Sequence, residues 1–422
     1  MKSVLRKIYY LSLRLAKKWW HAPFLIISLP VALVLTIIFP FYKVRFIRLC
    51  SDRIGHYAMN TELFLCYLDE IKEKRTKYFF YTLDAPICNS QLHTMWKRII
   101  LIIPFPKIVP QINACLRHIF GNRYKNDILK KIESGSGNQD IHGYFKKYQP
   151  HLSFTISEKK QGIKFLSDLG IPDGSPYVCL FVRDSAYLSK YFPDRDWSYH
   201  NYRDCDIDNF RKAALFLADL GYYVIRMGKV VLKSLDVNHE KVIDYANCSI
   251  RSDFGDIYLT AHCDFFISTP SGLDGVAQIF RRPILLVNMP IFVPGCLDYW
   301  YPSKLFITKK FFDRTRNKFI SLKELDNVLL NTVNFQKTSE DLNWIPIEND
   351  EDEILEAVRE MVNSFEKKNE EDSLSNPLHG LLKTQLPFLM MSGRSLLREY
   401  PEKCHVRICS QFLKNNYHLI SE

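Results

Sequence analysis

Short apolar runs alternate with amphipathic, helix-length segments along most of this chain. The alternation is clearest in the second half, where each apolar run ends in a polar turn and a helical pattern follows. Strand–helix–strand units with short connections favour a parallel, doubly wound sheet. The pattern predicts strands over 177–182, 222–226, 264–269 and 283–288, and helices over 208–220, 256–262, 273–281 and 350–366.

The first half shows a weaker form of the same alternation. A loop is expected over 50–60 and a helix over 61–74, because Thr61 suits an N-cap position and Glu62 lies near the positive end of the helix dipole. The apolar runs that predict strands here are 44–49, 78–82 and 99–103.

A chain of 422 residues exceeds one typical domain. The sequence therefore predicts an α/β protein with two Rossmann-like lobes behind an N-terminal membrane-anchoring segment. The expected parts are the anchor over 1–42, a first lobe over 43–150 that ends in a flexible crossover at 130–150, a second lobe over 151–366, and an acidic linker with a C-terminal helix over 367–422, its helical piece at 392–416.

The anchor prediction rests on the pattern of the first 42 residues. Residues 1–18 hold six Lys and Arg opposite an apolar helical face, and the stretch from Trp19 to Tyr42 has no Asp, Glu, Lys or Arg. A basic amphipathic helix lies in the membrane interface, where tryptophan is also at home. Pro30 in mid-segment favours a bent, re-entrant or interfacial segment over a straight span. A buried core helix is the alternative.

Net charge and cysteine usage narrow the possible binding partners and the cellular compartment. The formal net charge is +11, but outside the N-terminus the basic residues are scattered and form no nucleic-acid-binding motif. A basic surface suits anionic lipid and phosphate-bearing substrates equally well. The eleven cysteines include no Cys-x-x-Cys pair, which is typical of a reducing compartment. We therefore expect the protein to lie in the cytosol, and we expect no nucleic-acid partner.

Several familiar motifs are absent or misplaced. No Gly-x-Gly-x-x-Gly follows an expected strand, and no Gly-x-x-x-x-Gly-Lys-Ser/Thr occurs, which excludes the usual dinucleotide and P-loop sites. Asp204-x-Asp206 and Asp206-x-Asp208 match the metal-binding motif of single-domain sugar transferases. They stand just before an expected helix, so we interpret them as N-cap and first-turn acids. No metal and no cofactor are predicted.

Polar residues follow three expected strands of the second lobe, where open α/β sheets bind ligands. Backbone N–H groups at a helix start near Leu273 would attract an anion, Ser271 would add a hydroxyl, and Gly272 would admit a phosphate close to the backbone. A capped helix start in a structural turn is the alternative. The residues at the three ends are Arg183, then Arg226 and Gly228, then Thr269, Ser271, Gly272 and Leu273.

Residues 256–280, DIYLTAHCDFFISTPSGLDGVAQIF, resemble the donor-binding segment of the α1,6-fucosyltransferase and nodulation fucosyltransferase superfamily. The resemblance implies that Asp256 contacts the nucleobase and that Ser271 with Gly272 holds the diphosphate. It also implies that Arg183 grips the pyrophosphate, although Phe181 stands where the superfamily has histidine.

A resemblance over most of the chain after the anchor links it to a family of bacterial glycosyltransferases encoded with surface-polysaccharide genes. This resemblance implies the two-lobed GT-B type of fold, with an acceptor lobe first and a donor lobe second. The segments that carry it are Arg53–His56 with Asn60 and Glu62, Asn201–Arg203, Val224–Gly228, and Ser271–Gly272 with Asn288.

A candidate base lies in the first lobe. An inverting transfer needs a group that takes the acceptor hydroxyl proton, and a pKa near the working pH serves best. His56 is the first candidate, with Asp52 and Glu62 behind it. A loop histidine that only hydrogen-bonds locally is the alternative. Asp84 could also reach an acceptor, but nothing distinguishes it.

The sequence thus predicts a metal-independent glycosyltransferase. A nucleotide-sugar donor, with GDP as one candidate nucleotide, would supply the sugar, and a membrane-associated glycan or lipid-linked acceptor would receive it. The expected place is the cytoplasmic face of the bacterial inner membrane, in surface-polysaccharide or lipopolysaccharide synthesis. The alternatives are a catalytically inactive membrane-attached scaffold of a polysaccharide assembly complex and another nucleotide-sugar enzyme such as an epimerase.

Overall fold

The computed structural model describes residues 22–121, 140, 142–290, 303–330, 335–366 and 407–420. The chain divides into two compact units, Met1–Asn138 and Gln139–Glu422. Both contain a parallel sheet with helical crossovers, so the α/β fold class is confirmed. The division falls between residues 138 and 139, twelve residues before the expected lobe boundary.

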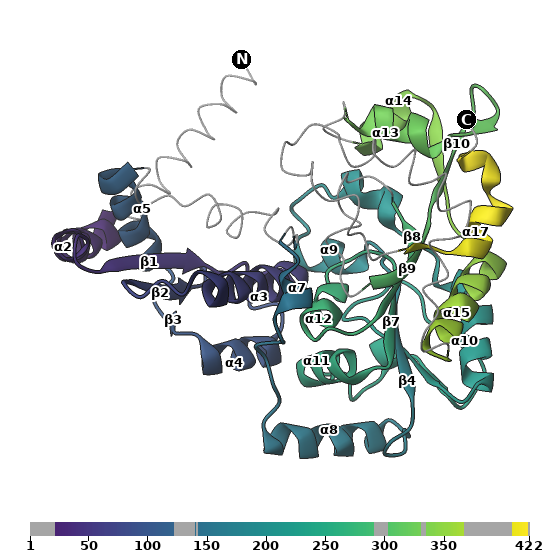
Figure 1. Cartoon of the computed structure of the whole chain (residues 1–422), viewed down its shortest axis with the longest axis horizontal. Helices are drawn as coiled ribbons and strands as arrows, with labels where there is room; N and C mark the ends of the chain where they lie inside the picture. The colour runs from purple at the N-terminus through teal and green to yellow at the C-terminus, as the bar shows by residue number, and fades with distance from the viewer. Residues whose placement is uncertain are drawn as a thin grey trace. The chain divides into compact units, whose positions relative to one another are not determined.

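The first unit is built on a three-stranded parallel sheet in the order β1-β2-β3 (Figure 1). Helix α3 connects the first two strands and α4 the second and third, as right-handed crossovers of parallel strands require. The elements are β1 (Lys43–Arg48), α3 (Ile54–Ile71), β2 (Thr76–Tyr81), α4 (Ser90–Ile99), β3 (Ile102–Ile103) and α5 (Val109–Phe120).

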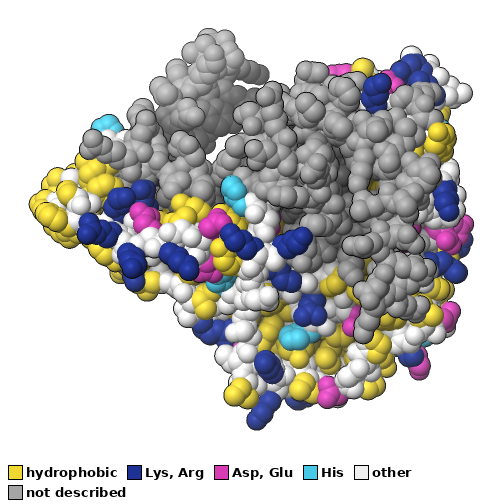
Figure 2. All heavy atoms as spheres, viewed as in Figure 1, with side chains coloured by type: hydrophobic (Ala, Val, Ile, Leu, Met, Phe, Trp, Pro, Cys, Tyr) yellow, Lys and Arg dark blue, Asp and Glu magenta, His cyan; other side chains and the backbone are white. Residues whose placement is uncertain are grey.

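Helix α2 (Ala22–Ile38) precedes this sheet and packs against α5. Its buried side is narrow, with Ser28 and Ala32 at 0% exposure, and Ala32 belongs to an apolar cluster with residues of β1 and α5. The opposite side is apolar and exposed, as at Ile26 and Ile37, both 73% exposed. In Figure 2 hydrophobic side chains gather over this helix. Within the described ranges, no helix combines the length and apolarity needed to cross a membrane.

The expected loop over 50–60 is wrong, because α3 begins at Ile54. Thr61 is not an N-cap: it lies inside the helix, where its hydroxyl donates to the Tyr57 carbonyl at 2.7 Å. The true N-cap, Arg53, makes no side-chain capping bond, so the helix start carries no sequence signal. Burial of the helix on all sides from Tyr57 to Tyr67 stabilises the extra turns instead.

The second unit is built on a seven-stranded parallel sheet in the order β13-β9-β8-β7-β4-β5-β6. The chain starts at β4, moves outward through β5 and β6, and then returns to the other side of β4 for β7, β8 and β9. The topological switch point therefore lies between β4 and β7. The strands are β4 (Tyr177–Phe181), β5 (Tyr223–Arg226), β6 (Val242–Ile243), β7 (Phe265–Ser268), β8 (Ile284–Met289), β9 (Ser303–Thr308) and β13 (Arg407–Ile408).

Helices cover both faces of this sheet (Figure 1). Helices α11 and α12 lie on one face with α8 beyond α11, and α10 packs against α15 on the other. The elements are α7 (Tyr144–Lys147), α8 (Ile156–Asp168), α9 (Ala186–Tyr191), α10 (Arg211–Asp219), α11 (Asp253–His262), α12 (Asp274–Ile279), α15 (Glu351–Glu366) and α17 (Ser410–Asn415), with 3-10 turns η2 (Ser198–Arg203), η3 (Ile207–Phe210), η4 (Tyr245–Asn247) and η7 (Tyr417–Leu419).

Two features of the second unit differ from the expected pattern. A small antiparallel sheet, ordered β11-β10-β12, packs with α13 and α14 around Phe311 and Trp344. Of the expected helix over 392–416, the described part is helical at α17 (Ser410–Asn415), while residues 407–408 form edge strand β13 beside β9. The remaining elements are β10 (Lys310–Asp313), β11 (Lys318–Phe319), α13 (Leu322–Leu330), α14 (Phe335–Asp341) and β12 (Trp344–Ile347).

Some expected elements lie outside the described residues. These are the basic helix over 1–18, most of the crossover at 130–150, the acidic linker from 367 and residues 392–406 of the C-terminal piece. The predicted helix over 208–220 begins instead as the 3-10 turn η3 and becomes α-helical only at Arg211.

Gly162 of α8 allows this helix to pack closely on α11. A Cβ atom at this position would lie 1.9 Å from the ring of Tyr258. We therefore expect Gly162→Ala to destabilise the second unit by about 1–3 kcal/mol, as overpacking does. Thermal unfolding measures the loss, and Lys160→Ala, an exposed change on the same helix, is the control. An unchanged melting temperature for Gly162→Ala would contradict the close packing.

Candidate active site

The candidate site lies at the switch point, outside the carboxyl ends of β4 and β7. The backbone N–H of Arg183, two residues after β4, donates to the hydroxyl oxygen of Thr269 at 2.7 Å. The Thr269 N–H in turn donates to the Phe181 carbonyl at 3.1 Å. Open α/β sheets bind ligands in the crevice at this point of the topology. Arg183 and Thr269 therefore stand where the sequence predicts a ligand.

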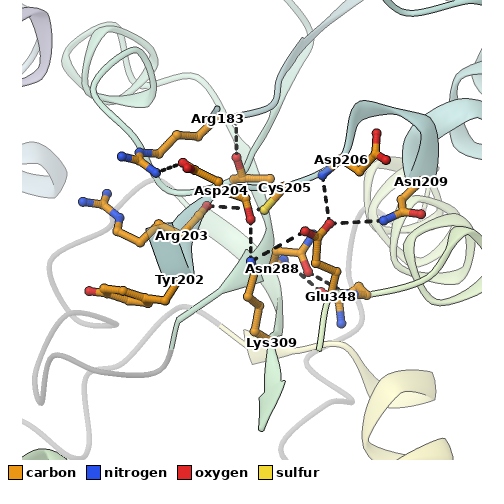
Figure 3. Close-up of polar contacts among 12 residues, drawn as sticks. Arg183, Tyr202, Arg203, Asp204, Cys205, Asp206, Asn209, Asn288, Lys309 and Glu348 are labelled. Carbon is orange, nitrogen blue, oxygen red and sulfur yellow. Dashed lines mark hydrogen bonds and ion pairs between the residues drawn. The ribbon is translucent and has the colours of Figure 1, made fainter. Parts of the chain in front are cut away.

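The Arg183 side chain is buried and paired. Its exposed fraction is 8%, and Nη1 forms an ion pair with the Asp204 carboxylate (Figure 3). Nη1 also donates to the His200 carbonyl at 3.2 Å. Burial, and after it the nearby charge of Arg203, lowers the pKa of Arg183. The carboxylate that pairs with Arg183 thus comes from Asp204, 21 residues further along the chain.

A second arginine reaches the same edge of the sheet. Arg203 ends η2, and its Nη2 donates to the Pro270 carbonyl in the turn after β7 at 2.7 Å. Its Nε atom is buried and has no hydrogen-bond partner among the described residues. Two guanidinium groups that repel one another are stable together only near negative charge. Asp204 supplies that charge to Arg183, and burial raises the pKa of its carboxyl group.

The turn after β7 is closed by a carboxylate of the chain itself. Asp274, the first residue of α12, is 3% exposed and accepts hydrogen bonds from the Ser271 N–H at 2.8 Å and the Ser268 hydroxyl at 3.2 Å. Burial raises the pKa of Asp274 to about 7. The Ser271 hydroxyl is buried without a partner among the described residues. The Ser271 hydroxyl therefore remains able to donate a hydrogen bond to a ligand, whereas the Ser271 N–H is already engaged.

The other residues of this turn frame the site. Leu273 occupies the N-cap position of α12, one residue before the helix, and is 8% exposed. Gly272 precedes it, and its carbonyl accepts from the Gly275 N–H at 3.3 Å. Since α12 has only six residues, we attach no anion site to the helix start alone.

Arg226, the last residue of β5, and Gly228, two residues later, shape a loop. The Arg226 guanidinium is 1% exposed, pairs with Asp244 at 3.0 Å and donates to the Lys233 carbonyl at 2.9 Å. A Cβ atom on Gly228 would lie 2.6 Å from Val231. Both residues therefore hold the connection between β5 and β6 in the described structure, and their predicted contact with a donor stays a prediction.

Asp256 belongs to a charged cluster at the start of α11. Its carboxylate pairs with Arg251 through Oδ2, while Oδ1 is buried without a partner among the described residues. Burial raises the pKa of Asp256 to about 6, against the influence of Arg251. Lys229, beyond β5, pairs with Asp253 at 3.1 Å. The helix begins at Asp253, so Asp256 lies in its first turn. Its half-satisfied carboxylate belongs to a cluster of two basic and two acidic side chains.

Two of the first-unit candidates, His56 and Glu62, lie on α3. His56 is half-buried, and burial followed by the charge of Arg53 lowers its pKa, which leaves the imidazole neutral at pH 7. Glu62 is fully buried on the same helix. Asp52 precedes the helix, and Asp84 pairs with Lys107 at 3.3 Å on the surface. A neutral imidazole is the protonation state that a general base requires.

Sequence reasoning missed Lys309 and Glu348. Lys309 follows β9, is 2% exposed, donates to the Asp204 carbonyl at 2.6 Å and lies 3.9 Å from the Glu348 carboxylate (Figure 3). Glu348 also accepts from the Asp206 N–H at 2.9 Å. These contacts hold the 204–206 turn in place. The only available signal was a strand end, since Lys309 directly follows an apolar run.

The aspartates of the two Asp-x-Asp matches have different roles in the structure. The Asp206 side chain caps η3 by accepting from the Asp208 N–H at 3.0 Å, which confirms the N-cap interpretation for this residue. Lys233 pairs with both Asp206 and Asp208. For Asp204 the interpretation as a helix-start acid is wrong, because its carboxylate pairs with Arg183.

Comparison with known proteins adds similarities of fold. No family model matches the chain, and no curated protein matches it. Among solved structures, a glycosyl transferase family 9 protein from Veillonella parvula is 12% identical, with a TM-score of 0.39 over 58% of this chain and 80% of that one. The ADP-heptose lipopolysaccharide heptosyltransferase II of E. coli is 14% identical, with a TM-score of 0.34 over 63% and 90%.

A third similar structure is the iron-containing dodecameric glycosyltransferase TibC from enterotoxigenic E. coli, 15% identical with a TM-score of 0.31 over 60% of this chain and 61% of that one. The resemblance to fucosyltransferases stays a prediction. This chain is an α/β protein with parallel sheets that is similar to these bacterial glycosyltransferases.

Proposed function

We propose that this chain is a glycosyltransferase of the two-lobed GT-B type that takes its sugar from a nucleotide-sugar donor. The observation that carries the proposal is the pair of guanidinium groups, Arg183 and Arg203, at the switch point of the second sheet. A diphosphate presents the negative charge that such a pair attracts, and two of its oxygens can accept the paired N–H groups of a planar guanidinium. The Ser271 hydroxyl supplies a further donor beside them.

The chemistry follows from where negative charge develops. When the glycosidic bond to the donor breaks, charge builds on the leaving diphosphate, so donors fixed in advance stabilise the transition state most. Both side-chain hydrogen bonds of Arg183 start from Nη1, toward Asp204 and the His200 carbonyl. Its remaining N–H groups would bind the diphosphate, while Asp204 keeps the guanidinium in place. On this proposal the transfer needs no divalent metal.

The acceptor side of the proposal rests on the first unit. His56 would take the acceptor hydroxyl proton, because its lowered pKa keeps the imidazole neutral at working pH. The proposed acceptor is a glycan or lipid-linked saccharide of bacterial surface-polysaccharide synthesis. His56→Ala would then lower transfer while leaving donor binding intact.

We also propose that the exposed face of α2 contacts the membrane. Apolar side chains around most of the helix, among them Ile26, Leu33 and Ile37 at 59–73% exposure, would bury their surface in lipid. The narrow side toward α5 attaches this surface to the first unit. The place of action would be the cytoplasmic face of the inner membrane, where lipid-linked acceptors and cytosolic nucleotide sugars meet.

Turnover of nucleotide sugars by the full-length protein tests the proposed activity. GDP-, UDP- and ADP-linked sugars, including ADP-heptose, are incubated with the protein, and release of the nucleoside diphosphate is measured with and without membrane lipid extract. Slow donor hydrolysis that the extract accelerates supports a transferase. Donor binding without any turnover would favour an inactive scaffold, and interconversion of sugar nucleotides without diphosphate release would favour an epimerase.

Asp256 gives a prediction for the nucleotide. An ionised carboxylate at Oδ1 accepts hydrogen bonds from guanine N–H groups, so Asp256→Asn should weaken guanine-nucleotide binding about tenfold or more and uridine-nucleotide binding much less. Because the pKa of Asp256 is raised to about 6, guanine affinity should rise as the pH increases through 6. Titration calorimetry measures both effects.

Asp253→Asn is the matched control, since Asp253 contacts Arg251 at 3.5 Å and Lys229 but has no role in reading the base. Equal affinity of the unmodified protein for guanine and uridine nucleotides would remove the basis for a GDP-sugar donor.

A further inference from the structure

An aromatic cluster lies in the segment that connects the two arginines of the site. We name it the aromatic platform, and it consists of Phe192, Trp197, Tyr199 and His200. The Tyr199 and His200 ring centroids are 4.0 Å apart, and the Trp197 ring is nearly parallel to that of His200 at 13° and 6.2 Å. Phe192 meets Trp197 edge-on at 5.9 Å. The four rings therefore pack together as one continuous cluster.

The aromatic platform is accessible. Tyr199 is 42% exposed, and Phe192, Trp197 and His200 are half-buried. Between and beside these rings stand short polar or charged residues that are exposed themselves. Aromatic rings of this size dominate the energetics of binding when they are covered, and an exposed cluster of them is uncommon unless something binds. The exposed polar neighbours are Asp194, Arg195, Asp196, Ser198 and Asn201.

The aromatic platform is also held in a defined conformation. The Trp197 indole N–H donates to the Phe192 carbonyl at 3.1 Å, and the Arg195 guanidinium lies over both rings, 5.8 and 5.9 Å from their centroids. Asp196 accepts from the Ser198 N–H at 2.9 Å and so stabilises the start of η2. A surface fixed before binding loses little entropy when it is covered.

The platform is continuous with the diphosphate site. Arg183 donates to the His200 carbonyl at 3.2 Å, so the residue that ends the platform touches the proposed diphosphate arginine. Arg203, three residues later, bonds to the turn after β7. Tyr202 between them donates its N–H to the Gln336 side chain at 3.1 Å, which ties this end of the segment to α14.

We infer that the aromatic platform binds a pyranose ring of the sugar substrate. One face of a pyranose presents several polarised C–H bonds, which fit the negative face of an aromatic ring, and its hydroxyl groups need short polar side chains at the rim. The aromatic rings of the platform and the polar side chains beside them alternate along the segment, so both kinds of contact are present. The exposed carboxylates of Asp194 and Asp196 disfavour an anionic lipid surface or a nucleic acid at the same place. The inference rests on the proposed function and adds a subsite to it.

Two sources of the pyranose share this chemistry: the sugar of the donor and the sugar of the acceptor glycan. Binding is measured for three probes, a nucleoside diphosphate, the nucleotide sugar that the protein turns over, and oligosaccharides prepared from a bacterial surface polysaccharide. The full-length protein is compared with Trp197→Ala, Tyr199→Ala and the control Tyr417→Ala, a tyrosine 48% exposed elsewhere on the second unit.

We expect Trp197→Ala and Tyr199→Ala to weaken binding of the pyranose-bearing probe about 5- to 10-fold, the effect of losing one stacked ring. Nucleoside diphosphate affinity should not change, and Trp197→Phe should restore most of the loss. A loss confined to the nucleotide sugar assigns the platform to the donor, and a loss confined to oligosaccharides assigns it to the acceptor.

Three outcomes would overturn the inference: equal loss for the nucleoside diphosphate, which would make the platform a base-stacking surface; no change in any saccharide affinity; or no preference of the unmodified protein for sugar-bearing probes. Tyr199 makes no side-chain hydrogen bond in the described structure, so its replacement keeps the test valid if Trp197→Ala unfolds the segment. Failure of Arg183→Ala to affect turnover would instead count against the proposed function alone.

Discussion

Arg183→Ala is expected to reduce turnover by roughly 10²–10³-fold, the loss found when one preorganised donor is removed from a transition state. Donor affinity should fall less than turnover, because negative charge on the diphosphate is greatest as the bond breaks. Arg183→Lys should restore only part of the rate, since an ammonium group lacks the planar pair of donors. Turnover per folded molecule is the quantity to measure.

The structure sharpens the control for this experiment. Because Arg183 pairs with Asp204, its removal leaves a largely buried carboxyl group without its partner and is expected to lower the melting temperature as well. Asp204→Asn breaks the same ion pair but keeps the guanidinium. If Arg183 only held the η2 segment, both variants would lose similar stability and retain near-normal turnover. A large rate loss for Arg183→Ala alone supports contact with the diphosphate.

The second large effect concerns α2. Replacing Ile26, Leu33 and Ile37 together by serine is expected to weaken membrane binding about 100-fold, at roughly 1 kcal/mol for each exposed apolar side chain that would enter lipid. Stability should change little, because none of the three belongs to the buried side of the helix. Sedimentation with vesicles of bacterial inner-membrane lipids measures the partition.

Deletion of residues 1–42 would be a poorer test of the anchor than these serine substitutions. Ala32 and Leu35 pack in the apolar cluster of the first unit, so their loss would uncover β1 and α5. The matched control for the serine variant is Ile156→Ser with Leu232→Ser, two residues 77% and 70% exposed in the second unit. If the folded α2 variant sediments as completely as the unmodified protein, α2 does not bind the membrane.

The sequence by itself determined four strands and four helices of the second unit, but not β6, β9 or the small antiparallel sheet. Apolar runs such as 177–182 and 283–288 lie almost wholly within β4 and β8, because a strand buried on both faces leaves a continuous apolar signal. It also placed Arg183 and Thr269 at strand ends, since a polar residue after such a run stands at the sheet edge. The side-by-side position of these ends required the strand order, which the sequence does not contain.

Local signals failed where tertiary contacts replaced them. The start of α3 has no capping side chain, and a glycine in its first turn, Gly55, suggested a loop. Strand β13 has two residues, too few for any periodic pattern, and exists only because β9 offers it an edge. Propensity is weak evidence in both cases, because packing against a distant part of the chain contributes more free energy than the local preference.

The chemistry of the site was decided mainly by the tertiary structure. Lys309 belongs to no motif, and Arg203 was named only as part of the segment Asn201–Arg203, without a role. Arg203 reaches Pro270, and Lys309 reaches Asp204, from 67 and 105 residues away. Only the folded chain shows that Asp204 neutralises Arg183 and that Asp274 caps the turn after β7. Charge pairing depends on distance in space, and sequence spacing encodes such distances only within one helix or strand.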